Sequence, residues 1–438
     1  MRNEKEETMK RHPVKEVVCD ILILGGGVAG AAAAFAAARK GAAVILVEKS
    51  GRLGGTATNG LVSTLCGCYS SLPGRRKIIG GFRDILAEEL LRYGGIAEGV
   101  DRDTHRNDTC DPELLACALD ALMKQHGVQS MLSSCIIDAS FSGRSLRSVE
   151  VVNTEAGARC AILPRLAVDA SGGALLARMA DPASVVSGGE EGKLQAATMV
   201  FRMDCVDGDR ARLVTKEQIR ELLAEARLNG DVTGERGNGV LTVLPGNSSA
   251  IVNANWVKAD MSLPEDVTRG LMEGREKALE NARFFRKYVP GFENAILSSI
   301  APSLGVREAS RIRGAYVLSE EDITEGRRFD DEISLGSWPM EYHDYEQNKL
   351  VYLWSDKDYS IPYRCLLPNG LENVLAAGRN ISVSSMAYAS TRVMGPCMAI
   401  GQAAGTAMRL CLKMGALPKE VDREVLRETL LNEGAILE

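Results

Sequence analysis

The chain has 438 residues, enough for two domains or for one domain with a large insertion. Its hydrophobic fraction of 45% and charged fraction of 25% are those of an ordinary globular protein, so the composition disfavours disorder and a membrane bundle. The formal net charge of −6 disfavours electrostatic attraction to nucleic acid or to anionic lipid. We therefore expect no nucleic-acid partner and no membrane association.

The cysteine pattern and the N-terminal stretch favour a reducing compartment. The 11 cysteines are scattered and form no CxxC pair, which disfavours a zinc ribbon and a disulfide-stapled secreted fold. Residues 1–17 are polar and lack the apolar core of a secretory signal. We therefore expect a cytoplasmic protein with no metal site.

The first strong pattern is a βαβ unit. Residues 17–24 form a continuous apolar run that predicts a buried parallel strand, residues 31–40 predict an alanine-rich helix, and residues 42–49 predict a second strand. Gly25, Gly27 and Gly30 form a GxGxxG sequence at the turn between the first strand and the helix. In such a turn the first glycine permits the tight bend, the second lets the backbone approach a pyrophosphate, and the third lets the helix pack on the strand.

An acidic residue completes this unit. Glu48 ends the second strand, where a carboxylate can bind ribose hydroxyls, and the helix N-terminus would offer its amides to the phosphates. The alternative is a glycine turn that serves only to pack the helix on the strand. It would not explain why a strand, a helix, a second strand and an acidic residue all occur at the spacing of a dinucleotide site. The sequence therefore predicts a dinucleotide site.

The rest of the chain predicts a parallel sheet, a β-meander and a second domain. Residues 111–126 predict a helix with Asp111 as N-cap, and residues 131–141, 147–154 and 159–164 predict a β-meander. Residues 165–173 and 373–379 predict strands of the parallel sheet, and residues 395–415 predict the last long helix. Between them, helical stretches at 216–229 and 264–288 alternate with strand-like segments at 239–244 and 249–254. We expect an α/β fold, with a Rossmann-like domain (14–187 and 365–438) and an α+β substrate or cap domain (188–364).

Three further segments favour FAD over NAD. Gly54-Gly55-Thr56 follows the acidic strand and resembles the second phosphate-and-flavin loop of FAD enzymes, which NAD-binding Rossmann units normally lack. Ala170-Ser171-Gly172 resembles the "ATG" element of the same enzymes, and Ala377-Gly378-Arg379 resembles the strand end that meets the ribityl chain. The helix that starts near Pro396 would aim its amides at the pyrimidine edge of the flavin.

The chain as a whole resembles the FAD-dependent oxidoreductases related to the fumarate reductase and glutathione reductase superfamily. The motifs that carry the resemblance are GGGVAG, GGTATNGLV, GVREASRIRGAYVL, SWPMEYHD and the C-terminal stretch from NVLAAGRN to GQAAGTA. The resemblance covers most of the chain and implies a two-domain flavoenzyme that moves a hydride between flavin N5 and a small organic substrate. It does not specify the substrate, the electron partner or the oligomeric state.

The resemblance also implies the residues that contact the cofactor. They are Gly25, Gly27, Val28, Ala29, Gly30, Glu48, Lys49, Arg52, Gly54, Gly55, Thr56, Ala57, Asn59, Gly60, Ile136, Ala170, Ser171, Gly172, Gly378, Arg379, Pro396, Cys397 and Met398. None of the four histidines (His12, His105, His126 and His343) lies beside the GGTAT loop, so we expect non-covalent FAD.

The chain departs from its relatives at several positions. Ala57 occupies the place where disulfide reductases of the superfamily carry a redox cysteine, and no second GxGxxG follows residue 150. Cys66 and Cys68 have a spacing unsuited to a disulfide in a regular strand. They could line the flavin pocket, but we expect them to pack. Ser385 stands where the family often carries a histidine, which leaves the active-site chemistry open.

The candidate catalytic residues are His343, Arg392 and Arg307. His343 suits proton transfer beside a flavin and could be oriented by Glu341 or Asp344, or it could be a half-exposed loop histidine. Arg392 could bind a substrate carboxylate or form a structural ion pair. The alternatives for Arg307, with the neighbouring Glu308 and Arg311, are substrate contact or an interdomain salt-bridge network; Tyr363 and Ser385 are alternative proton carriers.

Two other functions remain open at this stage. The first is an FAD monooxygenase or halogenase, although no WxWxIP-like segment is present and Asp207-Gly208 is a weak match to a hydroxylase motif. The second is a non-redox flavoprotein such as an RNA-modifying module, which the negative charge and the lack of a basic stripe disfavour.

Overall fold

The computed structural model describes residues 15–101, 105–188, 194–233, 240–347 and 349–438. At its centre is a parallel arrangement in the order β6, β2, β1, β9 and β20. These strands span Gln129–Met131, Val44–Val47, Lys15–Leu24, Arg159–Asp169 and Val374–Ala376, respectively. The C-terminal half of β1 is buried because both faces of the sheet are covered, which is why its sequence is continuously apolar. The predicted Rossmann-like α/β fold is confirmed.

The predicted β-meander is present, with one difference. β7 (Ser134–Ser142) and β8 (Ser145–Asn153) join the N-terminal half of β9 in antiparallel pairs, whereas β20 pairs with its C-terminal half. The sequence predicts two strands separated at Pro164, but β9 runs through this residue. Pro164 lies between the part of β9 paired with β8 and the part paired with β20, where a missing amide hydrogen is tolerated.

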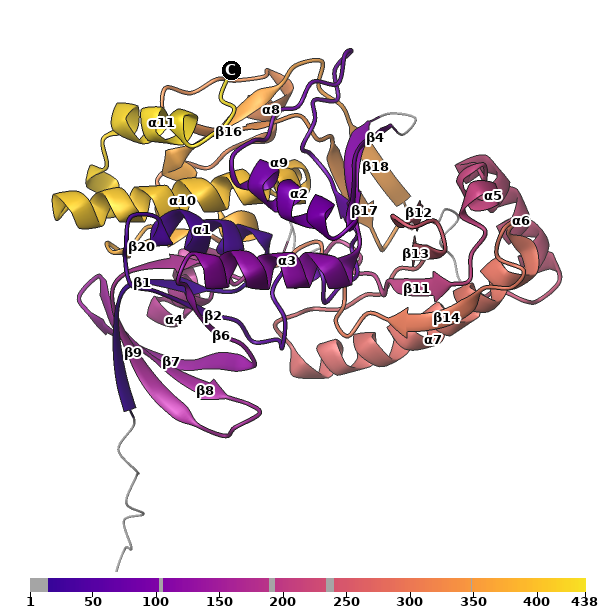
Figure 1. Ribbon diagram of the computed structural model, residues 1–438, viewed down its shortest axis with the longest axis horizontal. Helices are drawn as coiled ribbons and strands as arrows, with labels where there is room; N and C mark the ends of the chain where they lie inside the picture. Colours follow the sequence, from indigo (N-terminus) through magenta and orange to yellow (C-terminus); the bar gives the residue numbers. More distant parts are fainter. Residues whose placement is uncertain (1–14, 102–104, 189–193, 234–239, 348) are drawn as a thin grey trace, which may run out of the picture.

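Two long helices cover one face of the sheet and lie side by side (Figure 1). They are α1 (Val28–Ala38) and α10 (Met394–Met414). A Cβ atom on Gly401 would lie 2.0 Å from the carbonyl oxygen of Ala29, and one on Gly405 would lie 2.1 Å from that of Ala33. The small residues of both helices therefore allow their backbones to touch.

Two more helices pack outside α1: α2 (Phe82–Arg92) and α3 (Pro112–Gln125). The Asp111 side chain accepts hydrogen bonds from the amides of Glu113 and Leu114, which confirms the predicted N-cap. The remaining helices and strands of this side are α4 (Leu175–Ala180), α8 (Glu320–Thr324), α9 (Ser385–Thr391), α11 (Arg423–Asn432), β3 (Thr64–Leu65), β4 (Ile96–Asp101), β5 (Arg106–Cys110), β10 (Val185–Val186) and β15 (Arg311–Ile312).

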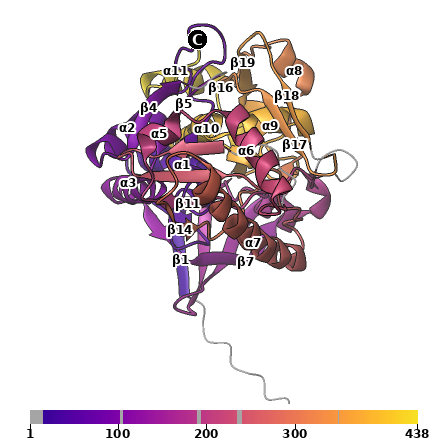
Figure 2. The same ribbon diagram turned by 90° about the vertical axis from the view of Figure 1, so that its right-hand side faces the viewer.

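A second hydrophobic core lies in the region that Figure 2 shows in front. Its sheet has the order β12 (Val240–Val243), β13 (Ser249–Asn253), β11 (Phe201–Asp204) and β14 (Ile296–Ile300). Three helices accompany this sheet: α5 (Gly208–Arg212), α6 (Lys216–Leu228) and α7 (Pro264–Tyr288). The two long predicted helices of this region are thus confirmed.

The segment before Arg364 packs differently from the rest of the predicted cap. It forms two hairpins, β16 (Glu332–Gly336) with β19 (Tyr359–Pro362), and β17 (Met340–Asp344) with β18 (Lys349–Leu353). Side chains of these hairpins belong to the core of α1 and α10. The domain division at 188 and 364 stays a prediction, and the packing favours a narrower cap, from about 195 to 306. The predicted domain start at residue 14 and His12 lie outside the described residues.

Within the described part of the chain, no helix combines the length and the apolar character needed to cross a membrane.

Candidate active site

The first glycine loop requires glycine at two positions because of close backbone approaches. Gly25 has a φ of +93°, and a Cβ atom there would lie 2.5 Å from the carbonyl oxygen of Ala170. A Cβ atom on Gly30 would lie 1.8 Å from the carbonyl oxygen of Gly25. Gly30 therefore allows α1 to pack on the turn itself rather than on the strand, which corrects the predicted role of this glycine.

Gly27 is needed for a different reason. Its φ of −63° and ψ of 177° suit any residue, and a Cβ atom would have only the Cα of Gly55 within 4 Å, at 3.9 Å. The protein itself would therefore accept a side chain here. Gly27 is the N-cap of α1, with no side-chain cap and no acidic residue in the first turn. The helix N-terminus thus faces open space and fits a phosphate group.

The second glycine loop lies against the first. A Cβ atom on Gly55 would lie 2.9 Å from the Cα of Gly27, and the Gly54 amide donates to the carbonyl of Gly26 over 2.8 Å. Within this loop, Asn59 donates through Nδ2 to the Ser50 hydroxyl over 2.9 Å. Both loops therefore meet at the start of α1, as an FAD site requires.

Glu48 is buried and holds the first loop in place. One carboxylate oxygen accepts from the Gly26 amide over 2.6 Å, and the other accepts from the amide and the hydroxyl of Ser50. Each oxygen can accept more than one hydrogen bond, so a ribose hydroxyl remains compatible with this arrangement. Lys49 is exposed, and Arg52 forms an ion pair with Glu113, with 2.6 Å between Nη1 and Oε1. The ion pair with Glu113 accounts for the position of the Arg52 side chain without a nucleotide contact.

The two later segments converge on the same place. Gly378 has a φ of +70°, and a Cβ atom there would lie 2.8 Å from the Cβ of Ala29 and 3.9 Å from the Sγ of Cys397. Gly172 has a φ of +77° and lies against the guanidinium of Arg379. The sequence patterns had suggested this convergence, although the contacts of these residues with FAD stay predictions.

The start of α10 offers a flavin fewer amides than the sequence pattern predicts. The Gly395 amide donates to the carbonyl of Cys66 over 2.8 Å, Pro396 has no amide hydrogen, and the Cys397 amide bonds within the helix. Cys68 is buried, and the predicted packing role of this segment agrees with its place beside α10. Among the other predicted cofactor residues, Ala57, Ile136 and Met398 are buried among hydrophobic core residues.

His343 lies on β17 and is buried, so the alternative of a half-exposed loop histidine is wrong. Its Nε2 lies 2.9 Å from Oε1 of Glu341. Side chains alternate along a strand, so residues 341 and 343 share a face while Asp344 points away. Asp344 instead accepts from the Gln347 amide. Of the two possible orienting carboxylates, the structure selects Glu341.

The electrostatics of this pair keep the histidine neutral. Burial lowers the pKa of His343 to about 3, and the charge of Arg307 acts in the same direction, against the opposing effect of Glu341. Burial alone would raise the pKa of Glu341, but the hydrogen bond from His343 and the nearby guanidinium charges lower it below its usual range. His343 therefore donates through Nε2 and leaves Nδ1 as an acceptor, and this buried Nδ1 has no hydrogen-bond partner among the described residues.

Gln195 is a member of the site that the sequence pattern does not reveal. The Ala196 amide donates to the carbonyl of His343 over 3.0 Å, and the Gln195 side chain accepts from the His343 amide over 3.4 Å. The Gln195 side chain is buried, and its Nε2 lacks a partner among the described residues. Residue 195 is about 150 positions from His343 in sequence, so no local spacing could have connected them.

The arginines of the cluster bond mainly to backbone carbonyls. Arg392 donates through Nη2 to the carbonyl of Glu341 over 3.1 Å, and its Nε, also buried, has no partner among the described residues. Arg307 donates to the carbonyl of Ala196 over 2.7 Å. Both predicted arginines thus lie beside the His343 dyad.

The predicted salt-bridge alternative is seen at the residues that follow Arg307. Glu308 accepts from the Ser385 hydroxyl over 3.2 Å and lies 3.5 Å from Arg311, and burial raises the pKa of Glu308. Ser385 is therefore part of the cluster. Tyr363 is not, because its hydroxyl donates to the carbonyl of Pro418.

Comparison with known families agrees with this geometry. A family model described as FAD dependent oxidoreductase matches residues 20–430. The chain belongs to this family. The protein is thus an FAD-dependent redox enzyme, and the glycine loops around α1 fit its cofactor. A search of curated proteins found no match.

The chain is also similar to several solved structures at low identity. A geranylgeranyl bacteriochlorophyll reductase-like protein from Thermoplasma acidophilum is 13% identical, with 95% of this chain and 84% of that chain covered and a TM-score of 0.46. The p-nitrophenol 4-monooxygenase of Pseudomonas putida is 10% identical, with coverages of 96% and 89% and a TM-score of 0.48. A myxobacterial chondrochloren halogenase is 15% identical, with coverages of 94% and 78% and a TM-score of 0.44. At these TM-scores the similarities decide nothing about the reaction of this chain.

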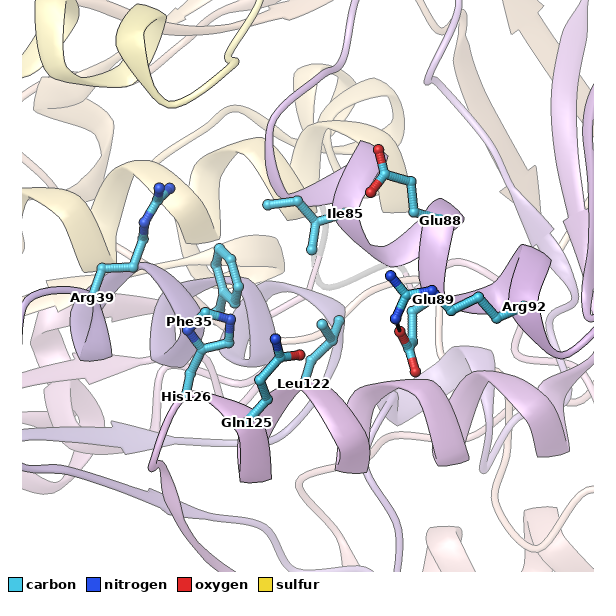
Figure 3. Close-up of a pocket in the computed structure, with 9 residues that line it drawn as sticks. All are labelled: Phe35, Arg39, Ile85, Glu88, Glu89, Arg92, Leu122, Gln125 and His126. Carbon is cyan, nitrogen blue, oxygen red and sulfur yellow. Dashed lines mark hydrogen bonds and ion pairs between the residues drawn. The ribbon is translucent and has the colours of Figure 1, made fainter.

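A cavity of about 260 Å³ lies elsewhere, between α1, α2 and α3 (Figure 3). It is lined by Phe35, Arg39, Ile85, Glu88, Glu89, Arg92, Leu122, Gln125 and His126. Glu89 accepts from Arg92, and the rings of Phe35 and His126 are 4.5 Å apart. The cavity shares no residue with the glycine loops or with the His343 cluster. Among the described residues, no group of three or more His, Cys, Asp or Glu side chains is placed to hold a metal ion.

Proposed function

We propose that this FAD dependent oxidoreductase transfers a hydride between a small organic substrate and flavin N5, with His343 carrying the accompanying proton. The observation that carries the proposal is the buried pair of His343 and Glu341, in which Nε2 is bonded to the carboxylate and Nδ1 has no partner in the described part of the chain. FAD, when bound, supplies the two-electron acceptor. The chain's own residues handle the proton and the substrate.

Glu341 sets the tautomer of His343. Because the carboxylate accepts the Nε2 hydrogen, the lone pair of Nδ1 is available to a substrate O–H or N–H group. Trp338 and Tyr352 also donate to Glu341, each over 3.2 Å, and so fix the carboxylate that orients the ring. When Nδ1 accepts a proton, the new positive charge is stabilised by this carboxylate. A base positioned in this way contributes about a hundred- to ten-thousand-fold to rate.

The arginines have two effects on this chemistry. Burial is the largest cause that lowers the pKa of His343, and the positive charges of the two arginines lower it further. The imidazole is therefore neutral near pH 7. They also favour a substrate that carries negative charge beside the reacting carbon. Arg392 is the better placed of the two for a direct contact, since its buried Nε lacks a partner among the described residues.

The cofactor is held by backbone groups and not by a covalent bond. The glycine loops would hold the phosphates at the start of α1, with Glu48 at the ribose. Heat denaturation should therefore release FAD, and acid precipitation should leave a colourless pellet. A flavin that stays with the pellet would contradict non-covalent binding, and Cys66, Cys68 and Cys397 would then be the first residues to examine.

An anaerobic screen of metabolites against the purified holoenzyme tests the proposed reaction. Oxidation of a true substrate should bleach the flavin band in a single turnover. An artificial electron acceptor should then restore the band, which a non-redox flavoprotein would not show. If the flavin is reduced only by nicotinamide nucleotides, and oxygen then enters a second substrate, the enzyme is a monooxygenase and the proposal is wrong.

A further inference from the structure

We infer that the substrate is a 2-hydroxy acid, whose carboxylate is bound by Nε2 of Gln195 and Nε of Arg392 and whose hydroxyl donates to Nδ1 of His343. The inference rests on the proposed function, because it uses the same histidine. It adds the chemical class of the substrate.

Three buried polar atoms without partners, among the described residues, belong to side chains that are connected to one another. Gln195 accepts from the amide of His343, and Arg392 donates to the carbonyl of Glu341, two residues before the histidine. The orphaned atoms are Gln195 Nε2, His343 Nδ1 and Arg392 Nε. A buried polar group left unpaired destabilises a protein, and native structures contain few of them. Three in one cluster indicate a ligand.

The types of the three atoms define the groups of that ligand. Gln195 Nε2 and Arg392 Nε can only donate, whereas His343 Nδ1 accepts because its Nε2 hydrogen is engaged by Glu341. The ligand must therefore present acceptor oxygens to two donors and one hydrogen to an acceptor. A carboxylate next to a carbon that bears a hydroxyl has this set. A neutral alcohol would satisfy only the histidine and leave the other two groups unpaired.

The charge of the cluster supports an anion and disfavours an ammonium group. The guanidinium groups of Arg307, Arg311, Arg379 and Arg392 donate to the carbonyls of Ala196, Val383, Val306 and Glu341, respectively. A backbone carbonyl carries no net charge, and among the described residues the carboxylates of the cluster are those of Glu308 and Glu341. The described guanidinium groups therefore outnumber the described carboxylates. An amino acid would bring its ammonium group into this field, whereas a hydroxy acid would not.

The reaction balances with the cofactor of the family as oxidant. The C2–H bond breaks, and its hydrogen leaves with both electrons for oxidised FAD. The O–H bond breaks, and its proton goes to Nδ1 of His343. The C2–O bond becomes a carbonyl, so the product is a 2-oxo acid.

The test measures binding and flavin reduction separately, on the holoenzyme. Calorimetry gives the dissociation constants of glycolate, lactate, mandelate and oxalate. Two further probes are benzyl alcohol, which lacks the carboxylate, and glycine, which carries an ammonium group in place of the hydroxyl. Gln195→Glu keeps the oxygen that accepts from the His343 amide and replaces the donor by a carboxylate oxygen, and Arg392→Lys keeps the charge but removes Nε. Each variant should weaken binding of the acids about ten- to hundredfold, since a hydrogen bond to a charged group contributes about 1.5–3 kcal/mol. Arg210→Lys, at an exposed arginine that pairs with Glu293, is the matched control and should bind like the parent.

The outcomes separate the two proposals. Three results would overturn the inference. The first is that glycolate and oxalate, which are small enough for any such site, do not bind. The others are that both variants bind the acids like the parent, or that glycine or benzyl alcohol binds as tightly as the hydroxy acids. If the acids bind and the variants weaken them, but no hydroxy acid bleaches the flavin, the site assignment holds and hydride transfer fails. If benzyl alcohol bleaches the flavin while the acids do not bind, the proposed function holds and this inference fails.

Discussion

The glycine loops and the His343 cluster lie in one molecule but are built by opposite means. The loops around α1 contribute backbone, and most of their glycines are required by a positive φ or by neighbouring atoms within 3 Å, whereas Gly27 has room for a side chain. The His343 cluster contributes side chains from segments far apart in sequence, and several of their polar atoms remain unpaired among the described residues. The loops thus offer backbone to the FAD after which the family is described, and the cluster offers polar side chains.

The difference has a consequence for substitutions. At Gly27 the protein has room for a side chain and only the cofactor does not, so a substitution should remove FAD without unfolding the chain. In the His343 cluster, Glu341 bonds to the His343 ring through its side chain and accepts from Arg392 through its carbonyl, so a substitution should leave FAD in place and change the reaction. The predictions below test this contrast.

The largest effect is expected for Gly27→Val, which should abolish FAD binding. A Cβ atom at this position points into the space before the first turn of α1, where the phosphates would lie. The purified variant should contain no flavin. Circular dichroism should show unchanged secondary structure. Gly51→Ala is the control, because a Cβ atom there meets only the Ser133 hydroxyl, at 3.6 Å. Normal flavin occupancy in Gly27→Val would show that the phosphates lie elsewhere.

His343→Ala should keep the FAD spectrum and slow flavin reduction by the true substrate at least about a hundredfold. The reason is that Nδ1 of His343 is a buried acceptor without a partner among the described residues, and Glu341 fixes the ring that carries it. Stopped-flow absorbance gives the rate at saturating substrate. His126→Ala is the matched control, since His126 packs on Phe35 in the cavity of Figure 3, and it should react like the parent. If His343→Ala reduces flavin at the parent rate, Ser385 becomes the next candidate, because it lies in the same cluster.

The sequence predicts the glycine loops well and the cluster in part, for physical reasons. A strand–turn–helix unit is local, so spacing alone places Gly25, Gly27 and Glu48. Alternation along a strand would also have selected Glu341 over Asp344, had residues 340–344 been identified as a strand. The contact of Gln195 with His343 arises where two distant segments cross, and the hairpins before Arg364 pack on α10 through tertiary contacts. Neither leaves a local pattern.

The pH dependence of flavin reduction should reflect the lowered pKa of His343. Burial lowers this pKa to about 3, so Nδ1 stays free of a proton as the pH falls through 6.5, and the rate should decline only as the pH approaches 3. Arg307→Met removes a positive charge that lowers this pKa, so the pKa rises and the acid decline should begin about one pH unit higher. Arg313→Met, at an exposed arginine, is the control. A rate that already halves near pH 6.5 in the parent would show that the base is a solvated histidine or another group.

The smallest expected effect belongs to Tyr352, whose hydroxyl donates to the carboxylate oxygen that also accepts from His343. Tyr352→Phe keeps the stacking on Trp354, where the ring centroids are 6.1 Å apart, and removes the hydrogen bond to Glu341. The saturating rate should fall about two- to tenfold, because a hydrogen bond of this kind contributes about 0.5–1.5 kcal/mol. The acid decline should also move to higher pH, because Glu341 then interacts more strongly with His343 and favours its protonated form. Tyr93→Phe is the matched control: Tyr93 is also partly exposed and donates to a glutamate, Glu89, over 2.6 Å, but it lies at the end of α2. A slower rate without a shift of the acid decline would mean that Tyr352 acts through packing and does not position Glu341.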